Sequence, residues 1–295
     1  MKIAILIQSN DLYDHLWEGL FLSWKLNWNW NKFDFPVYLI TETKDFIVNY
    51  KGNNFNTIKV GDDIKDIHNY STKLIRALNY LKQLNFTHIL YSQDDSWPLC
   101  AVDSLIINDV IDFIKRKEIK CFYLHEHFRE FPFTLKDTGI YIQNKRIRRF
   151  ANFSRFFYNH GNSFWDIDYL KSIQKIKENP SDNEPKTTER IWSTKEPFYF
   201  INIPWYDQKL INNKGVLLES GENILKQLKF RYKWEKVDSF CNSLISTNGI
   251  VMNLDPESDN FKTLSQQEIN NLYLLNDGLG YQYQGELNYE EINNS

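Results

Sequence analysis

Short apolar runs alternate with segments of helical spacing through the first 125 residues, and this alternation restricts the fold more than any other feature. Each apolar run is short and bounded by polar residues, as expected for strands buried in a sheet. The predicted strands cover residues 2–8, 35–41, 57–60, 87–92 and 120–124. The predicted helices cover residues 11–26, 67–81 and 102–115. Alternating strands and helices predict an α/β fold with a mostly parallel central sheet flanked by helices.

The pattern becomes less regular after about residue 130. A helix is predicted over 167–176 and a strand over 198–203, whereas the polar, proline-containing stretch 178–189 is predicted as a loop. Beyond residue 230 the chain is polar and rich in turn residues. We therefore expect a main domain over 1–225, with halves of about 1–125 and 126–225. We expect an extension over 226–295 that packs on the main domain or trails from it.

Composition excludes several classes of protein. Hydrophobic residues make up 42% and charged residues 25% of the chain, which excludes disorder over most of its length. A net charge of −3 argues against a nucleic-acid partner bound through bulk positive charge. Aromatic residues reach 16%, a content that suits a thick core or a surface that stacks on sugars and bases.

The cysteine pattern and the lack of long apolar runs suggest where the protein works. Cys100, Cys121 and Cys241 are widely spaced and form no Cys-x-x-Cys pair, so a cysteine zinc site is not expected. This pattern fits a reducing cytoplasm. The apolar run from Ile3 to Ile7 is too short for a signal-peptide core, and no run approaches the ~18 residues of a membrane span. We expect a cytoplasmic protein without a transmembrane segment.

Two adjacent carboxylates form the strongest chemical feature. Gln93-Asp94-Asp95 comes directly after the apolar strand predicted over 87–92. In open α/β sheets, ligands bind beyond the carboxyl ends of the strands. Neighbouring carboxylates attract a hard divalent cation, which keeps several waters and also binds phosphate oxygens. The alternative is a loop in which one Asp caps the next helix.

The order of elements before these acids resembles the nucleotide-binding half of GT-A-fold glycosyltransferases. A strand with a polar end, a helix, a strand that ends in acids and an amphipathic helix precede the acidic strand. In that family an Asp-x-Asp-type motif holds a metal against the diphosphate of a sugar nucleotide, and Gln93-Asp94-Asp95 resembles the variant without the first Asp. The resemblance implies that Asp95 binds Mn²⁺ or Mg²⁺ and that Asp94 touches the ribose or donor sugar. Gln93 leaves strict metal dependence open.

Other residues at the same predicted sheet edge are candidates for donor binding. Asp62 and Asp63 end the third strand, where the resemblance implies contacts with the base or ribose and a turn cap is the alternative. Gln8 ends the first strand and is predicted to touch the base. Lys73 and Arg76 lie on the helix before the acidic strand. Lys73 is predicted to neutralise phosphate charge, with a solvated helix face as the alternative.

Residues 159–170 resemble a segment of polysaccharide-building transferases in which a strand leads into an acceptor-side helix. This resemblance implies that His160 and Asn162 bind the acceptor. His125, in a His-Glu-His triplet after the strand 120–124, is assigned to the acceptor pocket, with simple polar exposure as the alternative, in preference to a metal site. The basic run 145–149 is predicted as a solvated loop, with an anionic acceptor or a membrane surface as alternatives.

Residues 178–190 resemble the loop and helix start that supply an acidic catalytic base in inverting members of the family. Glu189, within Thr-Thr-Glu-Arg, is predicted to be that base, with Glu184 and Asp182 as alternatives. A general base takes the proton of the acceptor hydroxyl while that oxygen attacks the anomeric carbon. A structural explanation for Glu189 is a first-turn glutamate stabilised by the helix dipole.

The sequence therefore predicts a hexosyltransferase-type glycosyltransferase. It would move a sugar from a nucleoside-diphosphate sugar to a glycan or glycolipid, with Mn²⁺ or Mg²⁺ as cofactor and with inversion favoured over retention. One alternative is a sugar nucleotidyltransferase, although the Gly-rich phosphate loop expected after the first strand is missing. Another is a non-catalytic carbohydrate-binding or structural protein with the same fold. No nucleic-acid partner is expected, and peripheral contact with a membrane stays open.

Overall fold

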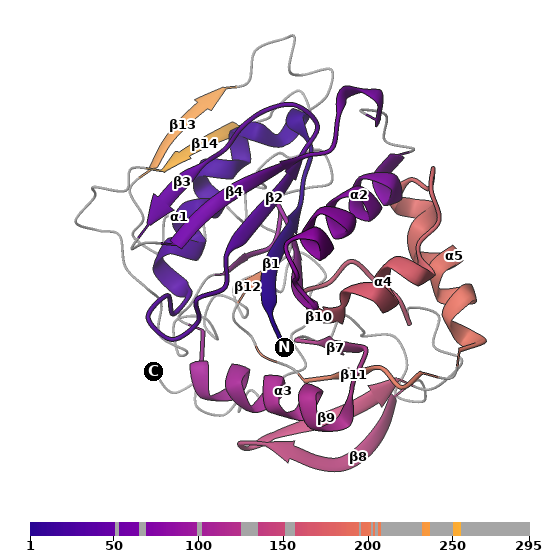
Figure 1. The fold of residues 1–295 in the computed structure, drawn as a ribbon. Helices are drawn as coiled ribbons and strands as arrows, with labels where there is room; N and C mark the ends of the chain where they lie inside the picture. The colour runs from indigo at the N-terminus through magenta and orange to yellow at the C-terminus, as the bar shows by residue number, and fades with distance from the viewer. Residues whose placement is uncertain are drawn as a thin grey trace.

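A mixed sheet organises the part of the chain that the computed structural model describes (Figure 1). The described residues are 1–50, 53–64, 69–98, 102–124, 135–150, 157–194, 196–201, 203, 206–207, 232–236 and 250–254. Within them, ten strands form the main sheet in the order β3-β4-β2-β1-β5-β10-β7-β11-β9-β8. Helices cover both faces of this sheet, so the predicted α/β class is confirmed.

The strands and helices have the following bounds. The main sheet contains β1 (Ile3–Gln8), β2 (Val37–Thr41), β3 (Val48–Tyr50), β4 (Asn53–Lys59), β5 (His88–Gln93), β7 (Cys121–Tyr123), β8 (Leu135–Ile142), β9 (Lys145–Phe150), β10 (Ser163–Asp166) and β11 (Tyr199–Phe200). Two separate pairs are β6 (Trp97–Pro98) with β12 (Tyr206–Asp207) and β13 (Tyr232–Lys236) with β14 (Ile250–Leu254). The helices are η1 (Asp11–Leu16), α1 (Trp17–Asn27), η2 (Asp62–Ile64), α2 (Tyr70–Gln83), α3 (Ser104–Lys117), α4 (Ile167–Ile173) and α5 (Pro180–Trp192).

Four parallel neighbours, β4, β2, β1 and β5, form the centre of the sheet. Ile7 lies opposite Leu39 of β2 on one side and Ser92 of β5 on the other. The predicted parallel centre of the sheet is therefore confirmed. Strand β10 runs antiparallel between β5 and β7, and β7 and β11 again point the same way as β5. The ends of β1, β2, β4, β5 and β7 therefore meet at one side of the sheet, here called the C-terminal edge, where β10 begins.

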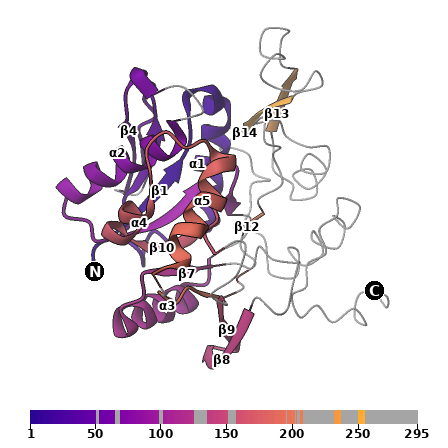
Figure 2. The same ribbon diagram turned by 90° about the vertical axis from the view of Figure 1, so that its right-hand side faces the viewer.

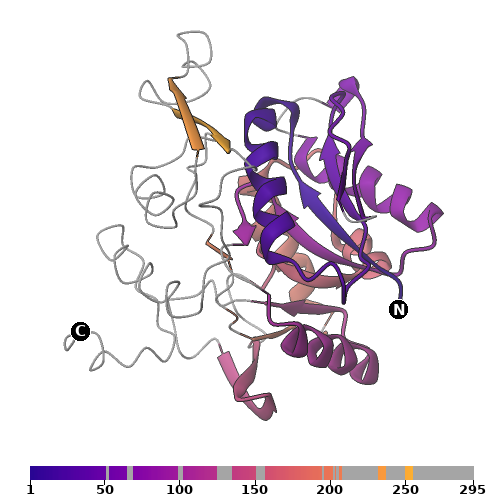
Figure 3. The same cartoon turned by 90° about the vertical axis from the view of Figure 1, so that its left-hand side faces the viewer.

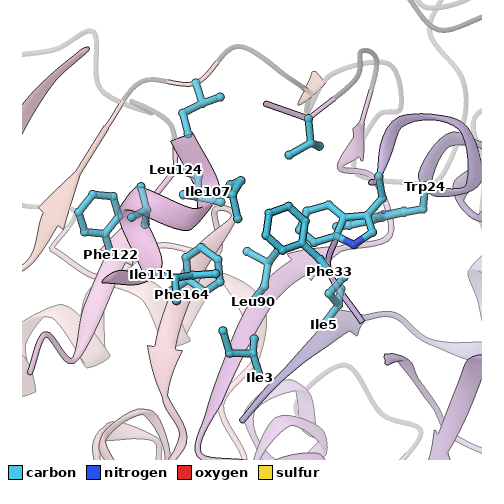
Figure 4. Packing of buried hydrophobic residues seen from close by; sticks show 14 of the residues in the cluster. Ile3, Ile5, Trp24, Phe33, Leu90, Ile107, Ile111, Phe122, Leu124 and Phe164 are labelled. Atoms are coloured by element: carbon cyan, nitrogen blue, oxygen red, sulfur yellow. The ribbon is translucent and has the colours of Figure 1, made fainter. Parts of the chain in front are cut away.

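The two faces of the sheet bury separate cores. Along β1, Ile3, Ile5 and Ile7 pack into one core, while Ala4 and Leu6 pack into the other, because successive side chains of a strand point to opposite faces. Helices α1 and α3 supply the first core, part of which Figure 4 shows around Trp24 and Ile107. Helices α2, α4 and α5 supply the second core. Helices α4 and α5 lie toward the viewer in Figure 2. Figure 3 views the molecule from the opposite side, and there the indigo helix α1 lies toward the viewer.

The prediction of a loop over 178–189 is wrong, because helix α5 begins at Pro180 and covers most of this stretch. The Asn179 side chain accepts a hydrogen bond of 2.8 Å from the Asp182 backbone N–H and so caps the helix. Pro180 occupies the first turn, where its missing N–H costs nothing. Pro185 removes one later hydrogen bond, but the buried side of the helix compensates. The buried residues on that side are Asn183, Thr187, Thr188 and Ile191. Three of the four are polar, so the sequence lacks the apolar spacing by which a helix is predicted.

Three further expectations change in detail. The basic run 145–149 forms strand β9 and not a loop, because Ile147 and Phe150 are buried in the two cores. The helix predicted over 11–26 is a 3₁₀ turn, η1, followed by α1. The strand predicted over 198–203 is short, although Ile201 and Ile203 still donate backbone hydrogen bonds to Tyr123 and Leu124. The predicted boundary between residues 225 and 226 lies outside the described residues.

None of the helices in the described part of the chain combines the length and the apolar character needed to span a bilayer.

Replacing the cap of α5 tests how much this helix depends on its first turn. Asn179→Ala is expected to lower the free energy of unfolding by about 1 kcal/mol, because the Asp182 N–H loses its partner. Urea unfolding monitored by circular dichroism measures the change. Lys175→Ala, at an exposed position outside the helix, is the control and should stay within about 0.5 kcal/mol. Equal stability of the two variants would show that the cap contributes nothing.

Candidate functional site

The acidic pair lies at the C-terminal edge, where β5 ends beside β1. The Asp94 backbone N–H donates to the Gln8 carbonyl at 3.1 Å, which continues the pairing of the two strands. The Ser9 hydroxyl donates to Asp94 Oδ2 at 2.5 Å and accepts from the Trp17 indole N–H at 2.8 Å. An indole nitrogen can only donate, so the single proton of Ser9 points to Asp94. Helix α1 therefore sets the orientation of one carboxylate.

Several polar atoms at this edge, Ser96 Oγ and Asn162 Oδ1 among them, are buried without a hydrogen-bond partner among the described residues, and two of these atoms belong to the predicted donor site. They are the amide oxygen of Gln8 and Oδ1 of Asp95. Most buried polar atoms in proteins are paired, so these two mark a place where a ligand can supply the missing contacts. Asp94 and Asp95 suit a hard cation that is completed by water and phosphate oxygens. No cluster of three or more His, Cys, Asp or Glu side chains suited to a metal occurs in the described part of the chain.

Burial makes both carboxyl groups hard to ionise. It raises the pKa of Asp94 to about 8, and the neighbouring charge of Asp95 adds to this shift. It raises the pKa of Asp95 to about 6. A bound cation would favour the ionised forms of both groups, because opposite charge offsets the loss of water. The pair is therefore arranged to hold a positive ligand better than it holds two negative charges alone.

The raised pKa of Asp94 predicts a pH-dependent stability. The folded protein binds a proton that the unfolded chain has already lost, so stability falls as pH rises toward 8. Relative to Asp94→Asn, the wild type should lose about 1.4 kcal/mol per pH unit between pH 5 and 7. Urea unfolding of both proteins at several pH values measures this difference. Mn²⁺ should stabilise the wild type more at pH 8 than at pH 6. A constant difference between the two proteins would contradict the shifted pKa.

Gln93 connects the acidic pair to the neighbouring part of the edge. Its side-chain amide donates to the Tyr70 hydroxyl at 3.1 Å, and that hydroxyl lies 2.6 Å from the hydroxyl of Tyr91. Burial is the main reason why the pKa of Tyr91 lies well above its ordinary value. The neighbouring Tyr70 and the charges of Glu184 and Asp95 raise this pKa further. The carboxylates of Glu184 and Asp95 thus act on the same hydroxyl group. Gln93 therefore helps to hold Tyr70 and Tyr91 in place.

His160 and Glu184 lie on this second part of the edge. Residues 159–162 precede Ser163, which pairs with Tyr91 of β5 and Tyr123 of β7. The His160 ring lies 4.7 Å from that of Tyr70, measured between ring centroids. Glu184 Oε1 accepts the His160 backbone N–H at 2.8 Å and lies 3.4 Å from Nδ1 of the ring. The structure therefore joins the predicted acceptor segment to α5 through Glu184.

Glu189, the base predicted from the sequence, lies elsewhere on α5. Its side chain is exposed, whereas Asn183, Thr187 and Ile191 are buried. Five residues after Glu184, it projects about 140° further around the helix axis. The structure therefore brings Glu184 to His160 and does not bring Glu189 there. Asp182, the other alternative, forms a pair with Lys186 at 3.2 Å on the surface.

Lys73 has a partner that the sequence did not reveal. Its ammonium group forms a buried ion pair with Glu42, which follows β2. The second carboxylate oxygen of Glu42 accepts the Asp11 backbone N–H at 2.5 Å. Asp11 in turn accepts hydrogen bonds from the Glu42 and Thr43 backbone N–H groups, both at 2.9 Å. In the structure Lys73 thus ties α2 to the ends of β1 and β2, and Glu42 could have been suspected only from its position after a strand.

The remaining candidates have different surroundings. Asp63 forms a two-point ion pair with Arg76 at 2.8 and 2.6 Å, and both side chains are exposed. Asp62 is exposed beside it in η2. Asn162 is buried at the start of β10, and its Oδ1 has no hydrogen-bond partner among the described residues. His125 lies outside the described residues.

Comparisons with known proteins find similarity only among solved structures. No protein-family model and no curated protein matches the sequence. The chain is similar to a crystal structure of Staphylococcus aureus TarS, with 12% identity, a TM-score of 0.44, and coverage of 70% of this chain and 36% of that one. The chain thus spans about a third of that TarS chain.

Two further structures give similar values. TarS 1–349 in complex with UDP-GlcNAc has 10% identity and a TM-score of 0.47, with coverage of 99% of this chain and 78% of that one. A cytidylyltransferase from Leptospira borgpetersenii has 15% identity and a TM-score of 0.43, with coverage of 98% and 99%.

Proposed function

We propose that this protein is a glycosyltransferase that uses a nucleoside-diphosphate sugar as its donor. The observation that carries the proposal is the carboxylate pair at the C-terminal edge, where Asp95 Oδ1 and the Gln8 amide oxygen are buried without partners in the part of the chain that the structure describes. Ligands of open α/β sheets bind at this edge. A diphosphate bound through a divalent cation, with a base or sugar that carries N–H or O–H groups, supplies both the charge and the donors that these oxygens lack.

Asp95 would hold the cation, and Asp94, oriented by Ser9, would be its neighbour or a contact of the ribose. Mn²⁺ or Mg²⁺ would supply positive charge to the diphosphate as it leaves. Gln8 would accept a hydrogen bond from the base. Asp62 and Asp63 remain candidates for contacts with the base or ribose. Because Lys73 is paired with Glu42, its role would be to hold the nucleotide side of the edge together, beside or in place of a direct phosphate contact.

His160 and Asn162 would line the acceptor side, which faces Glu184. The acceptor hydroxyl would lose its proton to the carboxylate of Glu184 while its oxygen attacks the anomeric carbon. The bond from that carbon to the diphosphate would break, and the leaving group would keep the electron pair. Attack opposite the leaving group inverts the anomeric configuration, so we propose an inverting hexosyltransferase that acts on a glycan or glycolipid. The buried thiol of Cys121 fits the reducing cytoplasm predicted from the sequence.

A panel of nucleoside-diphosphate sugars tests the proposal. Thermal unfolding is measured with each donor, with and without Mn²⁺, because a ligand that binds only the folded protein raises the apparent stability. Donors that stabilise the protein are then incubated with glycan acceptors, and transfer is followed by mass spectrometry. Donor binding together with transfer supports the proposal. Binding without transfer or hydrolysis would indicate a carbohydrate-binding protein.

The same panel includes nucleoside triphosphates mixed with sugar 1-phosphates. Release of pyrophosphate from this mixture, without transfer from any nucleoside-diphosphate sugar, would indicate a sugar nucleotidyltransferase. That outcome would replace the proposal, because the bond broken would then lie within the triphosphate and not at the anomeric carbon.

A further inference from the structure

A buried hydrogen-bond network determines which way the Asn183 amide points. Its nitrogen donates to Glu178 Oε2 at 2.9 Å and to Gln174 Oε1 at 2.8 Å. A carboxylate oxygen can only accept, so the nitrogen of Asn183 must face Glu178. Arg190 holds the same Glu178 carboxylate through two bonds of 2.7 and 2.9 Å. The oxygen of Asn183 is therefore the atom that faces His160, at 3.0 Å from Nε2.

This orientation determines the tautomer of His160. Because the Asn183 oxygen accepts, His160 Nε2 must carry the proton. Burial lowers the pKa of His160 against the opposing effect of Glu184, so the ring is neutral at pH 7. The unprotonated Nδ1 then faces Glu184 Oε1 at 3.4 Å. Two acceptor atoms thus face each other, and they gain a hydrogen bond only when a proton arrives between them.

In the described part of the chain, Glu184 is the only charged side chain in contact with the His160 ring. Tyr70 and Tyr158 pack against it with centroid distances of 4.7 and 5.5 Å. Burial raises the pKa of both phenols well above the ordinary value, so both stay neutral. The carboxylate of Glu178 contacts Asn183 and reaches the His160 ring only through that amide. An arriving proton is therefore shared by His160 and Glu184.

We infer that His160 Nδ1 and Glu184 Oε1 form a two-residue proton acceptor, and that Asn183 is a positioning residue that keeps the imidazole proton on Nε2. This inference rests on the proposed function for the origin of the proton, which is the acceptor hydroxyl. As that O–H bond breaks, the proton passes to Glu184 and is then held between its Oε1 and His160 Nδ1. Glu184 is the outer member, because a third of its side chain is exposed, against 8% for His160.

The tautomer can be measured without any substrate. Long-range ¹H–¹⁵N correlation spectra of the full chain distinguish Nε2–H, Nδ1–H and doubly protonated rings, and the His160 signals are identified by their loss in His160→Gln. We expect the neutral Nε2–H form at pH 7.5. A ring protonated on Nδ1, or on both nitrogens, at this pH would overturn the inference. This result does not depend on whether the protein transfers sugar.

Two substitutions test the role of Asn183. Asn183→Leu removes the acceptor for Nε2–H, so the proton is expected to move to Nδ1, where Glu184 can accept it. Thr187→Val is the matched control, because Thr187 is equally buried and belongs to the same network but does not contact the Asn183 oxygen. Its hydroxyl accepts from the Asn183 nitrogen at 3.4 Å and from Arg190 Nη2 at 2.5 Å, and Arg190 keeps its two bonds to Glu178 in this variant. The tautomer should change in the first variant and not in the second. An unchanged tautomer in a folded Asn183→Leu protein would contradict the positioning role.

His160→Gln tests the pair in turnover and keeps a side-chain N–H for Asn183. Transfer is expected to fall by about 100-fold, with donor affinity unchanged within about twofold, because only proton acceptance is impaired. Unchanged transfer would overturn the inference while leaving the proposed function intact. If the wild type itself binds no nucleoside-diphosphate sugar, the proposed function is wrong. The tautomer result would still hold, because it is measured without substrate.

Discussion

Asp95→Asn is expected to weaken Mn²⁺-dependent donor binding by about 100-fold or more. An amide is a poor replacement for a carboxylate as a ligand of a hard cation, and even indirect supports of a metal site cost 10–100-fold when removed. The substitution keeps the shape of the side chain and leaves the Ser9–Asp94 hydrogen bond in place. Calorimetric titration of Mn²⁺ with the preferred nucleoside-diphosphate sugar measures the affinity.

Asp103→Asn is the matched control for this experiment. Asp103 caps α3 by accepting the Leu105 and Ile106 backbone N–H groups at 2.9 and 3.3 Å. Asn is an equally good cap, so the control loses one charge and keeps its fold. Its donor affinity should match that of the wild type. If both variants bind the donor equally well, Asp95 serves only the turn after β5, and the site must be sought elsewhere.

Glu184→Gln is expected to reduce transfer by about 100-fold or more while donor binding stays nearly intact. The amide keeps the size of the side chain but cannot accept the proton of the acceptor hydroxyl at neutral pH. The loss should therefore fall on kcat and not on donor affinity, as expected for an interaction used in the transition state. Steady-state transfer assays with saturating donor, together with calorimetric donor titrations, separate the two effects.

Glu189→Gln distinguishes the structural assignment from the one made on sequence alone. Glu189 is exposed on another side of α5, so its substitution is expected to leave transfer within about twofold of the wild-type rate. A large loss in Glu189→Gln with normal transfer in Glu184→Gln would restore the sequence-based assignment. Losses in neither variant would show that neither Glu184 nor Glu189 serves as the base, and would leave Asp182 as the carboxylate of α5 to test.

Much of the fold could be predicted because its signals are local. The apolar run at Ile3–Ile7 needs no distant information to predict a strand that is buried on both faces. The helices between β1 and β2 and between β4 and β5 indicate parallel strands, as connections of this kind do, whereas β2 and β4 are joined through β3. Helix α5 escaped prediction because Asn183, Thr187 and Thr188 are buried through hydrogen bonds, and such a face carries no apolar periodicity.

The sequence by itself determined the α/β class and the arrival of Gln8, Asp94 and Asp95 at one edge, because strand direction decides at which edge each strand ends. Only the tertiary structure decided how the side chains at that edge are used. Lys73 meets Glu42 across 31 positions, and His160 meets Glu184 across 24. Such pairs depend on how a helix is rotated against the sheet, which is set by the packing of the whole core. The choice of Glu184 over Glu189 is a difference of rotation around α5, and no local pattern of residues specifies it.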